Sequence, residues 1–297
     1  MRILIGYDGR EGARDAAELA RQLAALEGGS ATLAYVIAGG WPATRRYEEV
    51  QTDRVAGASE LLAAGAAALA DVPAEARVFV GGSPARVLTE LAERDDFDLL
   101  VVGSPHRGAI GRALVGSVAE RLLHGASCTT VVAPRGYATK RHEAPRLVAV
   151  AYDGSPEAKL ALHRAETAAR AASASLRVLT VEEPLAVVPG VAGYTPPPPT
   201  EPKELLAEAR SGVPADIEVD GRALAGPVAE TLAEACEDGV DLLVVGSRGY
   251  GPLGRVLLGS VSTAILHKAP CPVLVVPRST AGTGAVERVG ALATERA

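Results

Sequence analysis

The sequence is poor in several features that mark large classes of protein. Aromatic residues make up only 3% of the 297 residues, which argues against the stacking surfaces of single-stranded nucleic-acid binders. The formal net charge is −6 and no block of lysine and arginine is present, so we expect no nucleic-acid partner. No apolar run approaches the roughly 18 residues of a membrane span, and the first residues lack a secretory pattern, so we expect no membrane partner.

Cysteine is also scarce. The three cysteines cannot form a disulfide framework, and none belongs to a CxxC pair or to a metal-ligand spacing. This usage predicts a reducing, cytoplasmic compartment. Hydrophobic residues are abundant at 48%, and charged residues make up 22%, which excludes a disordered chain. The length predicts two domains rather than one.

The chain contains an internal repeat. A glycine-rich segment at residues 103–118 recurs at residues 246–261, with an offset of 246 − 103 = 143. Near the start of each copy, residues 6–9 (GYDG) match residues 151–154 (AYDG), with an offset of 153 − 8 = 145. A period this long indicates duplicated domains. We predict domains at 1–138 and 145–278, followed by a loose tail at 279–297.

Each copy alternates apolar strand patterns with helical patterns. Residues 99–102 and 242–245 both read LLVV, so both faces of these strands must be covered by helices, as in a parallel sheet. Right-handed crossovers then give a doubly wound α/β domain in each half, with ligands beyond the carboxyl ends of the strands. The expected strands are 3–7, 33–37, 77–80, 98–102 and 129–133 in copy one, and 147–152, 176–181, 217–223, 241–246 and 272–276 in copy two.

A glycine loop in copy two has the features of a phosphate site. Gly246 and Gly249 are followed, after nine residues, by Gly259 and Ser260 at an expected helix start. Glycines let the backbone approach a ligand closely, and a helix N-terminus offers unpaired N–H groups with a partial positive charge. The alternative is a turn in which Ser260 only caps the helix.

Asp153 follows the first strand of copy two. Its carboxylate could accept a hydrogen bond from an adenine amino group or a ribose hydroxyl. The alternative is a turn residue that caps the helix beginning at Pro156. If the first and fourth strands are neighbours, Asp153 and Gly246 flank one crevice, which favours a ligand.

At these residues the chain resembles the universal stress protein family in its tandem two-domain form. The family's ATP-binding pattern, Gly-xx-Gly-x9-Gly-Ser/Thr, matches copy two. The resemblance implies two parallel five-stranded sheets of order 3-2-1-4-5, Rossmann-like and similar to adenine nucleotide alpha hydrolases, related by a pseudo-twofold axis. It also implies an adenine pocket between the Asp after strand one and a Val at the end of strand two.

The candidate nucleotide-binding residues follow from these matches. In copy two they are Asp153, Val181, Val245, Gly246, Arg248, Gly249, Gly259, Ser260 and Val261. In copy one they are Asp8, Val36, Gly103, His106, Gly116, Ser117 and Val118. The spacing 181 − 153 = 28 equals 36 − 8, so the two copies agree.

Copy one departs from the family pattern at one position. His106 stands where the second glycine belongs, and its side chain could narrow the phosphate site or donate to a phosphate. We therefore expect ATP in copy two. Arg248 could neutralise phosphate charge, or it could be a solvated surface residue.

The resemblance implies an ATP-binding stress-response protein that acts by regulation, without strong catalysis. We expect Mg²⁺ with the phosphates, but assign no protein ligand to it and no catalytic residue, because no nucleophile–base pair is recognisable. The alternatives are a slow ATPase or adenylyl-transfer enzyme, and an interaction module without nucleotide. The last strands, 129–133 and 272–276, are apolar edges that we expect to pair within the chain, and a homodimer stays open. The alternative to this pairing is that helices of the same half cover each edge strand.

Overall fold

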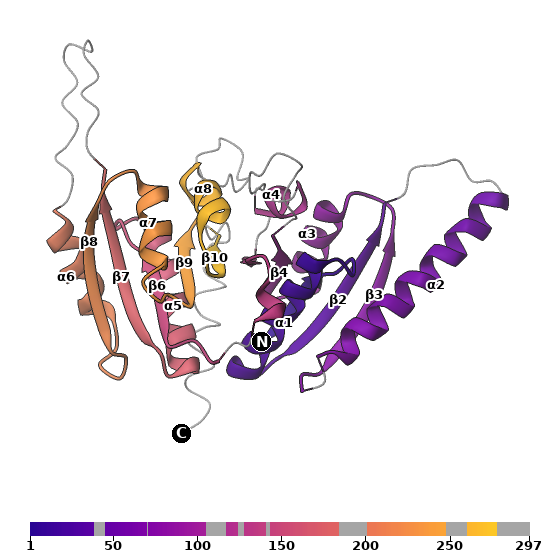
Figure 1. Cartoon of the computed structure of the whole chain (residues 1–297), viewed down its shortest axis with the longest axis horizontal. Helices are drawn as coiled ribbons and strands as arrows, with labels where there is room; N and C mark the ends of the chain where they lie inside the picture. The colour runs from indigo at the N-terminus through magenta and orange to yellow at the C-terminus, as the bar shows by residue number, and fades with distance from the viewer. Residues whose placement is uncertain are drawn as a thin grey trace, which may run out of the picture.

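The computed structural model describes residues 1–38, 45–69, 71–104, 117–123, 128–140, 143–183, 201–247 and 260–277. Ten strands form one sheet of order β3-β2-β1-β4-β5-β10-β9-β6-β7-β8. Figure 1 shows the two halves side by side, with β3 toward one end and β8 toward the other. The fold is α/β with a mostly parallel sheet, as the repeat predicts.

Each half has the same succession of elements. The N-terminal half consists of β1 (Arg2–Gly6), α1 (Glu11–Glu27), β2 (Ser30–Ile37), α2 (Arg45–Ala67), β3 (Ala74–Val80), α3 (Pro84–Arg94), β4 (Leu99–Gly103), α4 (Ser117–Leu123) and β5 (Thr129–Ala133). After a short 3-10 helix η1 (Tyr137–Thr139), the C-terminal half consists of β6 (Leu147–Ala151), α5 (Pro156–Ala172), β7 (Ser175–Glu182), α6 (Pro202–Gly212), β8 (Val219–Ala225), α7 (Val228–Cys236), β9 (Leu242–Gly246), α8 (Ser260–Lys268) and β10 (Val273–Val276).

Local signals set several helix ends. Gly28, with φ of 67°, follows the last residue of α1. Ser83 caps α3 by accepting a hydrogen bond from the Arg86 amide at 3.4 Å, and Ser155 caps α5 by accepting from the Ala158 amide at 3.2 Å. α5 therefore begins at Pro156, as expected, and a glycine after α1 and a serine before α3 mark the ends of those helices.

Three strands differ from the prediction by two or three residues at an end. The interior strand β2 begins at Ser30, three residues before the expected start at residue 33, and the other two are the outermost strands. β3 begins at Ala74, three residues before the expected start, and β8 is Val219–Ala225 rather than 217–223. Exposed and half-buried side chains dominate both strands, because each lies at an edge of the sheet. Their hydrophobic pattern is therefore too weak to mark their ends.

Helices cover both faces of the sheet. α1, α2, α5 and α6 pack on one face around a first core cluster that includes Ile3, Leu62 and Leu205. α3, α4, α7 and α8 pack on the other face around a second cluster that includes Leu4 and Ile265. Successive residues of β1 alternate between the two clusters, as the pleat of a strand requires. Each half is therefore doubly wound.

The two halves join through their last strands. β5 and β10 pair antiparallel, with Val131 opposite Leu274, and both side chains are fully buried. α1 and α5 pack against each other on the first-cluster face. There, Arg164 Nη2 donates to Glu27 Oε1 at 2.7 Å. The two five-stranded sheets thus become one sheet, and each of the two core clusters extends across both halves.

The linker between the halves is held by the N-terminal half. The wholly buried Asp15 carboxylate accepts from the amides of Gly136 at 2.9 Å and Ala138 at 2.8 Å. The Tyr137 hydroxyl donates to Gln22 at 2.7 Å. The predicted linker therefore begins as an anchored turn against α1. The predicted tail at 279–297 lies outside the described residues.

Among the described helices, none is both long enough and apolar enough to cross a bilayer. All three cysteines are unpaired. Cys236 and Cys271 are buried in the second core cluster, and Cys128 packs against it.

Candidate functional site

The candidate adenine pocket lies at the carboxyl edge of the sheet. β6 pairs with β7 so that Ala151 is opposite Leu179, and the Tyr152 amide donates to the Leu179 carbonyl at 2.8 Å. Continuing this register by two residues sets Asp153 beside Val181. In the N-terminal half, Gly6 is opposite Ala34, so the same extension sets Asp8 beside Val36.

The fourth strand of the C-terminal half adjoins the first. β9 pairs with β6, with Val150 opposite Val244, so β9 ends at Gly246 on the same edge as Asp153. In the N-terminal half, β4 pairs with β1 and ends at Gly103. The condition set by the sequence, that strands one and four are neighbours, is met in both halves.

Gly246 and Gly103 also serve the packing of the protein itself. A Cβ atom at Gly246 would lie 2.8 Å from the backbone carbon and oxygen of Glu157, in the first turn of α5. A Cβ atom at Gly103 would collide with the backbone of Gly12, in the first turn of α1. Close helix–strand packing is therefore reason enough for a glycine at both positions.

The two aspartates shape the turns that follow their strands. Asp153 Oδ1 accepts from the Ser155 amide at 3.1 Å. Asp8 Oδ1 accepts from the Arg10 amide at 3.0 Å, and its Oδ2 lies 3.6 Å from Arg10 Nε. Asp153 is thus a turn residue, but the cap of α5 is Ser155 and not Asp153. Both residues are nevertheless exposed, and a carboxylate can accept several hydrogen bonds at once, so a ligand contact is compatible with the turn.

The last helix of each half begins near this edge. α8 starts at Ser260 and α4 at Ser117. The next residues, Val261 and Val118, are partly buried against the second core cluster, as are Val181 and Val36. Four of the candidate valines therefore share one face of the sheet. Val245 is buried inside that cluster, so only its backbone could face a ligand.

Two buried hydroxyls that the sequence did not indicate form hydrogen bonds between the elements at this edge of the sheet. The Ser262 hydroxyl donates to the Gly246 carbonyl at 3.4 Å, joining the first turn of α8 to the end of β9. The Thr180 hydroxyl donates to the Tyr152 carbonyl at 3.1 Å, joining β7 to β6. Only the position of Ser262, two residues after Ser260, could have indicated its role.

The glycine loops themselves lie outside the described residues. This concerns Arg248, Gly249 and Gly259 in the C-terminal half, and His106 and Gly116 in the N-terminal half. The side chains of Ser260 and Ser117 are likewise not described. Across the described ranges, no group of three or more His, Cys, Asp or Glu side chains could hold a metal ion.

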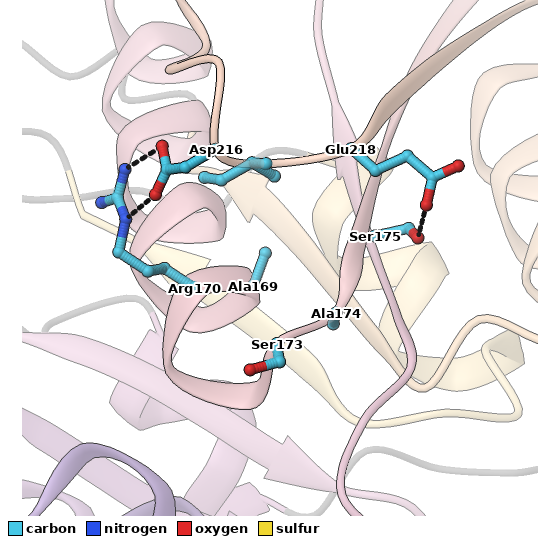
Figure 2. A pocket seen from close by; sticks show the side chains of 8 residues that line it. Ala169, Arg170, Ser173, Ala174, Ser175, Asp216 and Glu218 are labelled. Atoms are coloured by element: carbon cyan, nitrogen blue, oxygen red, sulfur yellow. Dashed lines mark hydrogen bonds and ion pairs between the residues drawn. The ribbon is translucent and has the colours of Figure 1, made fainter.

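A shallow cavity of about 350 Å³ lies at the opposite edge of the C-terminal half (Figure 2). Its charged groups are already matched, because Arg170 holds Asp216 through hydrogen bonds of 2.8 and 3.1 Å. The Ser175 hydroxyl donates to Glu218 at 3.0 Å. Ser175 begins β7, whereas Val181 lies near the end of that strand, so this cavity does not belong to the candidate nucleotide site.

Comparisons with known proteins agree with this architecture. The universal stress protein family matches residues 1–134 and 146–277. A universal stress protein of Mycolicibacterium smegmatis is 30% identical over 286 residues, covering 92% of this chain and 96% of the relative. One of Mycobacterium tuberculosis is 27% identical over 301 residues, covering 93% and 100%. The crystal structure of a universal stress protein from Archaeoglobus fulgidus is similar with a TM-score of 0.69 and 20% identity, over 93% of this chain and 98% of that one.

Proposed function

The chain belongs to the universal stress protein family, and from this premise we propose that its C-terminal half binds an adenine nucleotide, ATP with Mg²⁺. The site is the carboxyl edge of β7, β6 and β9 together with the start of α8. One observation supports the proposal: β6 lies between β7 and β9 at one edge of the sheet, and its pairing with β7 runs to Ala151 opposite Leu179, two residues before Asp153 and Val181 respectively.

Each group has a distinct role in this proposal. The Asp153 carboxylate accepts a hydrogen bond from the adenine amino group or from a ribose hydroxyl. Val181 supplies an apolar wall for the base. The nine-residue helix α8 directs its free N–H groups and positive dipole end toward the phosphates, and the loop that ends at Gly259 lines them.

The nucleotide acts as a regulatory ligand rather than as a substrate. Its binding stabilises one state of the protein or of an assembly, and shifts the populations by as much as its affinities for the two states differ. Through this shift the protein takes part in a stress response. Turnover of ATP faster than about 1 s⁻¹, the low end of ordinary enzymes, would contradict this role.

The proposal is tested by titrating ATP with Mg²⁺ into the purified full chain. We expect one equivalent to bind with the higher affinity, and Gly259→Asp to abolish this binding, because a carboxylate there repels the phosphates. Gly116→Asp is the matched control in the N-terminal half and should leave the binding intact. The reverse pattern would contradict the assignment to the C-terminal half.

A second pair of variants tests the base pocket. Asp153→Ala should weaken binding by about tenfold, the worth of a hydrogen bond to a charged group. Asp8→Ala, its counterpart, should leave the C-terminal affinity unchanged. Mass spectrometry of small molecules released from freshly purified protein should identify an adenine nucleotide; release of none, with no binding at millimolar ATP, would overturn the proposal.

A further inference from the structure

A second cavity lies between α1 and α2 in the N-terminal half. It has a volume of about 410 Å³, within the roughly 300–1,000 Å³ typical of small-molecule sites. Its lining includes Tyr7, Arg14, Ala17, Leu61, Ala64 and Leu69. It lies on the first-cluster face of the sheet, whereas Val36 of the nucleotide edge packs on the other face. The lining residues Tyr7 and Gly9 flank Asp8, but the proposed nucleotide site is in the C-terminal half, so this cavity is a separate place from it.

The C-terminal half shows which residues correspond to this lining. α5 has the same length as α1 and begins 156 − 11 = 145 residues later, which aligns Tyr7 with Tyr152, Arg14 with Lys159 and Ala17 with Leu162. A Cβ atom at Gly9 would meet Leu61, and one at the equivalent Gly154 would meet Leu205. This contact aligns α2 with α6 at 205 − 61 = 144, so Ala64 corresponds to Glu208.

In the C-terminal half this place is filled by the protein's own side chains. The Glu208 carboxylate lies 2.8 Å from Lys159 Nζ, half exposed at the surface. The Lys159 ammonium, and to a smaller degree the Tyr152 hydroxyl, hold the pKa of Glu208 below its usual value. Leu162 is buried in the core cluster below. The Glu208 carboxylate thus lies above an apolar interior and interacts with both Tyr152 and Lys159.

In the N-terminal half the carboxylate and the apolar filler are both missing. Ala64 stands in place of Glu208 and Ala17 in place of Leu162, so a cavity remains between the helices. Within the described residues, neither the Tyr7 hydroxyl nor the Arg14 guanidinium has a hydrogen-bond or ion-pair partner. Glu18, also on the lining, is paired with Arg21 at 2.8 Å.

We propose that this cavity binds a small carboxylic acid with an apolar tail. Its carboxylate takes the place that Glu208 holds in the other half, between the Tyr7 hydroxyl and the Arg14 guanidinium. Its tail lies against Leu61, Leu69 and the space that Ala17 leaves open. The two halves then share one interaction pattern, which the C-terminal half completes internally and the N-terminal half completes with a ligand.

The test uses octanoate as probe and octan-1-ol as its neutral control, each titrated calorimetrically into the full chain. We expect saturable binding of one equivalent of octanoate and clearly weaker binding of octan-1-ol. Arg14→Gln and Tyr7→Phe should each weaken octanoate binding by about tenfold or more, because each removes one hydrogen bond to a charged group. Arg14→Lys, which copies Lys159, should retain it. Equal affinity for octanoate and octan-1-ol would overturn the proposal.

Exchange variants test the alignment of the two halves directly. Ala64→Glu supplies the carboxylate from within the chain and should abolish octanoate binding while raising the melting temperature. Glu208→Ala combined with Leu162→Ala opens the C-terminal half and should add a second equivalent of bound octanoate. Unchanged octanoate binding in Ala64→Glu, or displacement of octanoate by ATP, would contradict a separate carboxylate site.

Discussion

Gly246 has no side chain because the first turn of α5 occupies the space where one would lie. The same arrangement recurs at Gly103 with the first turn of α1. Each glycine lets the start of its own half's first helix lie close to the strand that the glycine ends. A glycine predicted to let a ligand approach the sheet edge thus lets a helix pack closely there.

Gly246→Ala is therefore expected to destabilise the protein even without nucleotide. The added methyl group would lie 2.8 Å from the Glu157 backbone, and overpacking of this kind costs about 1–3 kcal/mol of the free energy of unfolding. Urea denaturation measures the change. Gly57→Ala is the control: Gly57 lies inside α2 with no atom near its Cβ position, and alanine should raise stability by about 0.5–1 kcal/mol.

Glu166 on α5 predicts a pH dependence. Burial raises the pKa of its carboxyl above the usual 4.5, although His163 and Arg170 oppose the shift. The protonated form therefore favours the fold at low pH, and this contribution is lost as the pH rises through the raised value. Glu166→Gln should be more stable than the natural protein at pH 7, by less than about 1 kcal/mol, and equally stable below pH 4.5.

Denaturation curves at pH 4 and pH 7 measure this difference. The exposed Glu204 on α6 provides the control, since the stability difference between Glu204→Gln and the natural protein should not change between pH 4 and pH 7. A Glu166→Gln variant that is less stable than the natural protein at pH 7 would show that the ionised carboxylate supports the fold there.

At the scale of elements, the short helix η1 is held in place by hydrogen bonds to a side chain of α1. Asp15 points from α1 into the linker and satisfies two of its amides, while the corresponding residue of α5, Leu160, can accept no hydrogen bond. The two halves therefore have the same order of strands and helices, but only α1 forms these hydrogen bonds with the linker. The linker behaves as part of the N-terminal half.

Asp15→Ala should lower the free energy of unfolding by about 1–3 kcal/mol, because two backbone amides lose their hydrogen bonds to a charged carboxylate. Asp15→Asn keeps one acceptor oxygen and should cost less. Hydrogen exchange followed by NMR supplies the local measurement: the amides of Gly136 and Ala138 should exchange faster in Asp15→Ala. Unchanged protection of both amides would show that the linker is held by other contacts.

At the scale of the whole molecule, β5 with β10 and α1 with α5 make the two halves one body. The antiparallel β5–β10 pair leaves neither apolar strand as an open edge. On the helical layer, Glu27 and Arg164 meet with side chains that are only 12% and 17% exposed. This ion pair crosses between the halves, so its loss tests their coupling.

Glu27→Gln and Arg164→Met should each cost about 1–3 kcal/mol of the free energy of unfolding, since each leaves a poorly solvated charge without its partner. A double-mutant cycle should give a coupling of about 1 kcal/mol or more. The exposed pair Arg170–Asp216 is the control and should show less than about 0.5 kcal/mol. Equal couplings for the two pairs would mean that burial between the halves adds nothing.

Several features of the fold follow from neighbouring residues alone. The apolar runs at 99–102 and 242–245 predict buried parallel strands, and Gly28, Ser83 and Ser155 predict helix ends. The edge strands β3 and β8 were misplaced by two or three residues because half of their surface faces water. Their extent depends on a neighbouring strand rather than on their own pattern.

The nucleotide edge was predictable in part. The equal spacing from Asp8 to Val36 and from Asp153 to Val181 predicts that each pair lies level. The strand register agrees with this up to Gly6 opposite Ala34 and Ala151 opposite Leu179, two residues before each pair. The close packing of Gly246 against the first turn of α5 was not predictable. Its neighbour Glu157 is 89 residues away in the sequence (246 − 157) and contacts it only in the folded chain.

The order of apolar and polar residues, read twice along the chain, determined by itself that this protein has two doubly wound halves and where most of their elements begin. Such patterns act over a few residues, so they are visible in the sequence. Only the tertiary structure shows that Asp15 binds the linker and that Glu27 forms an ion pair with Arg164. It alone also shows a cavity beside Ala64, at the place that Glu208 occupies in the other half. Each depends on side chains brought together from distant elements, and packing rather than local propensity selects those partners.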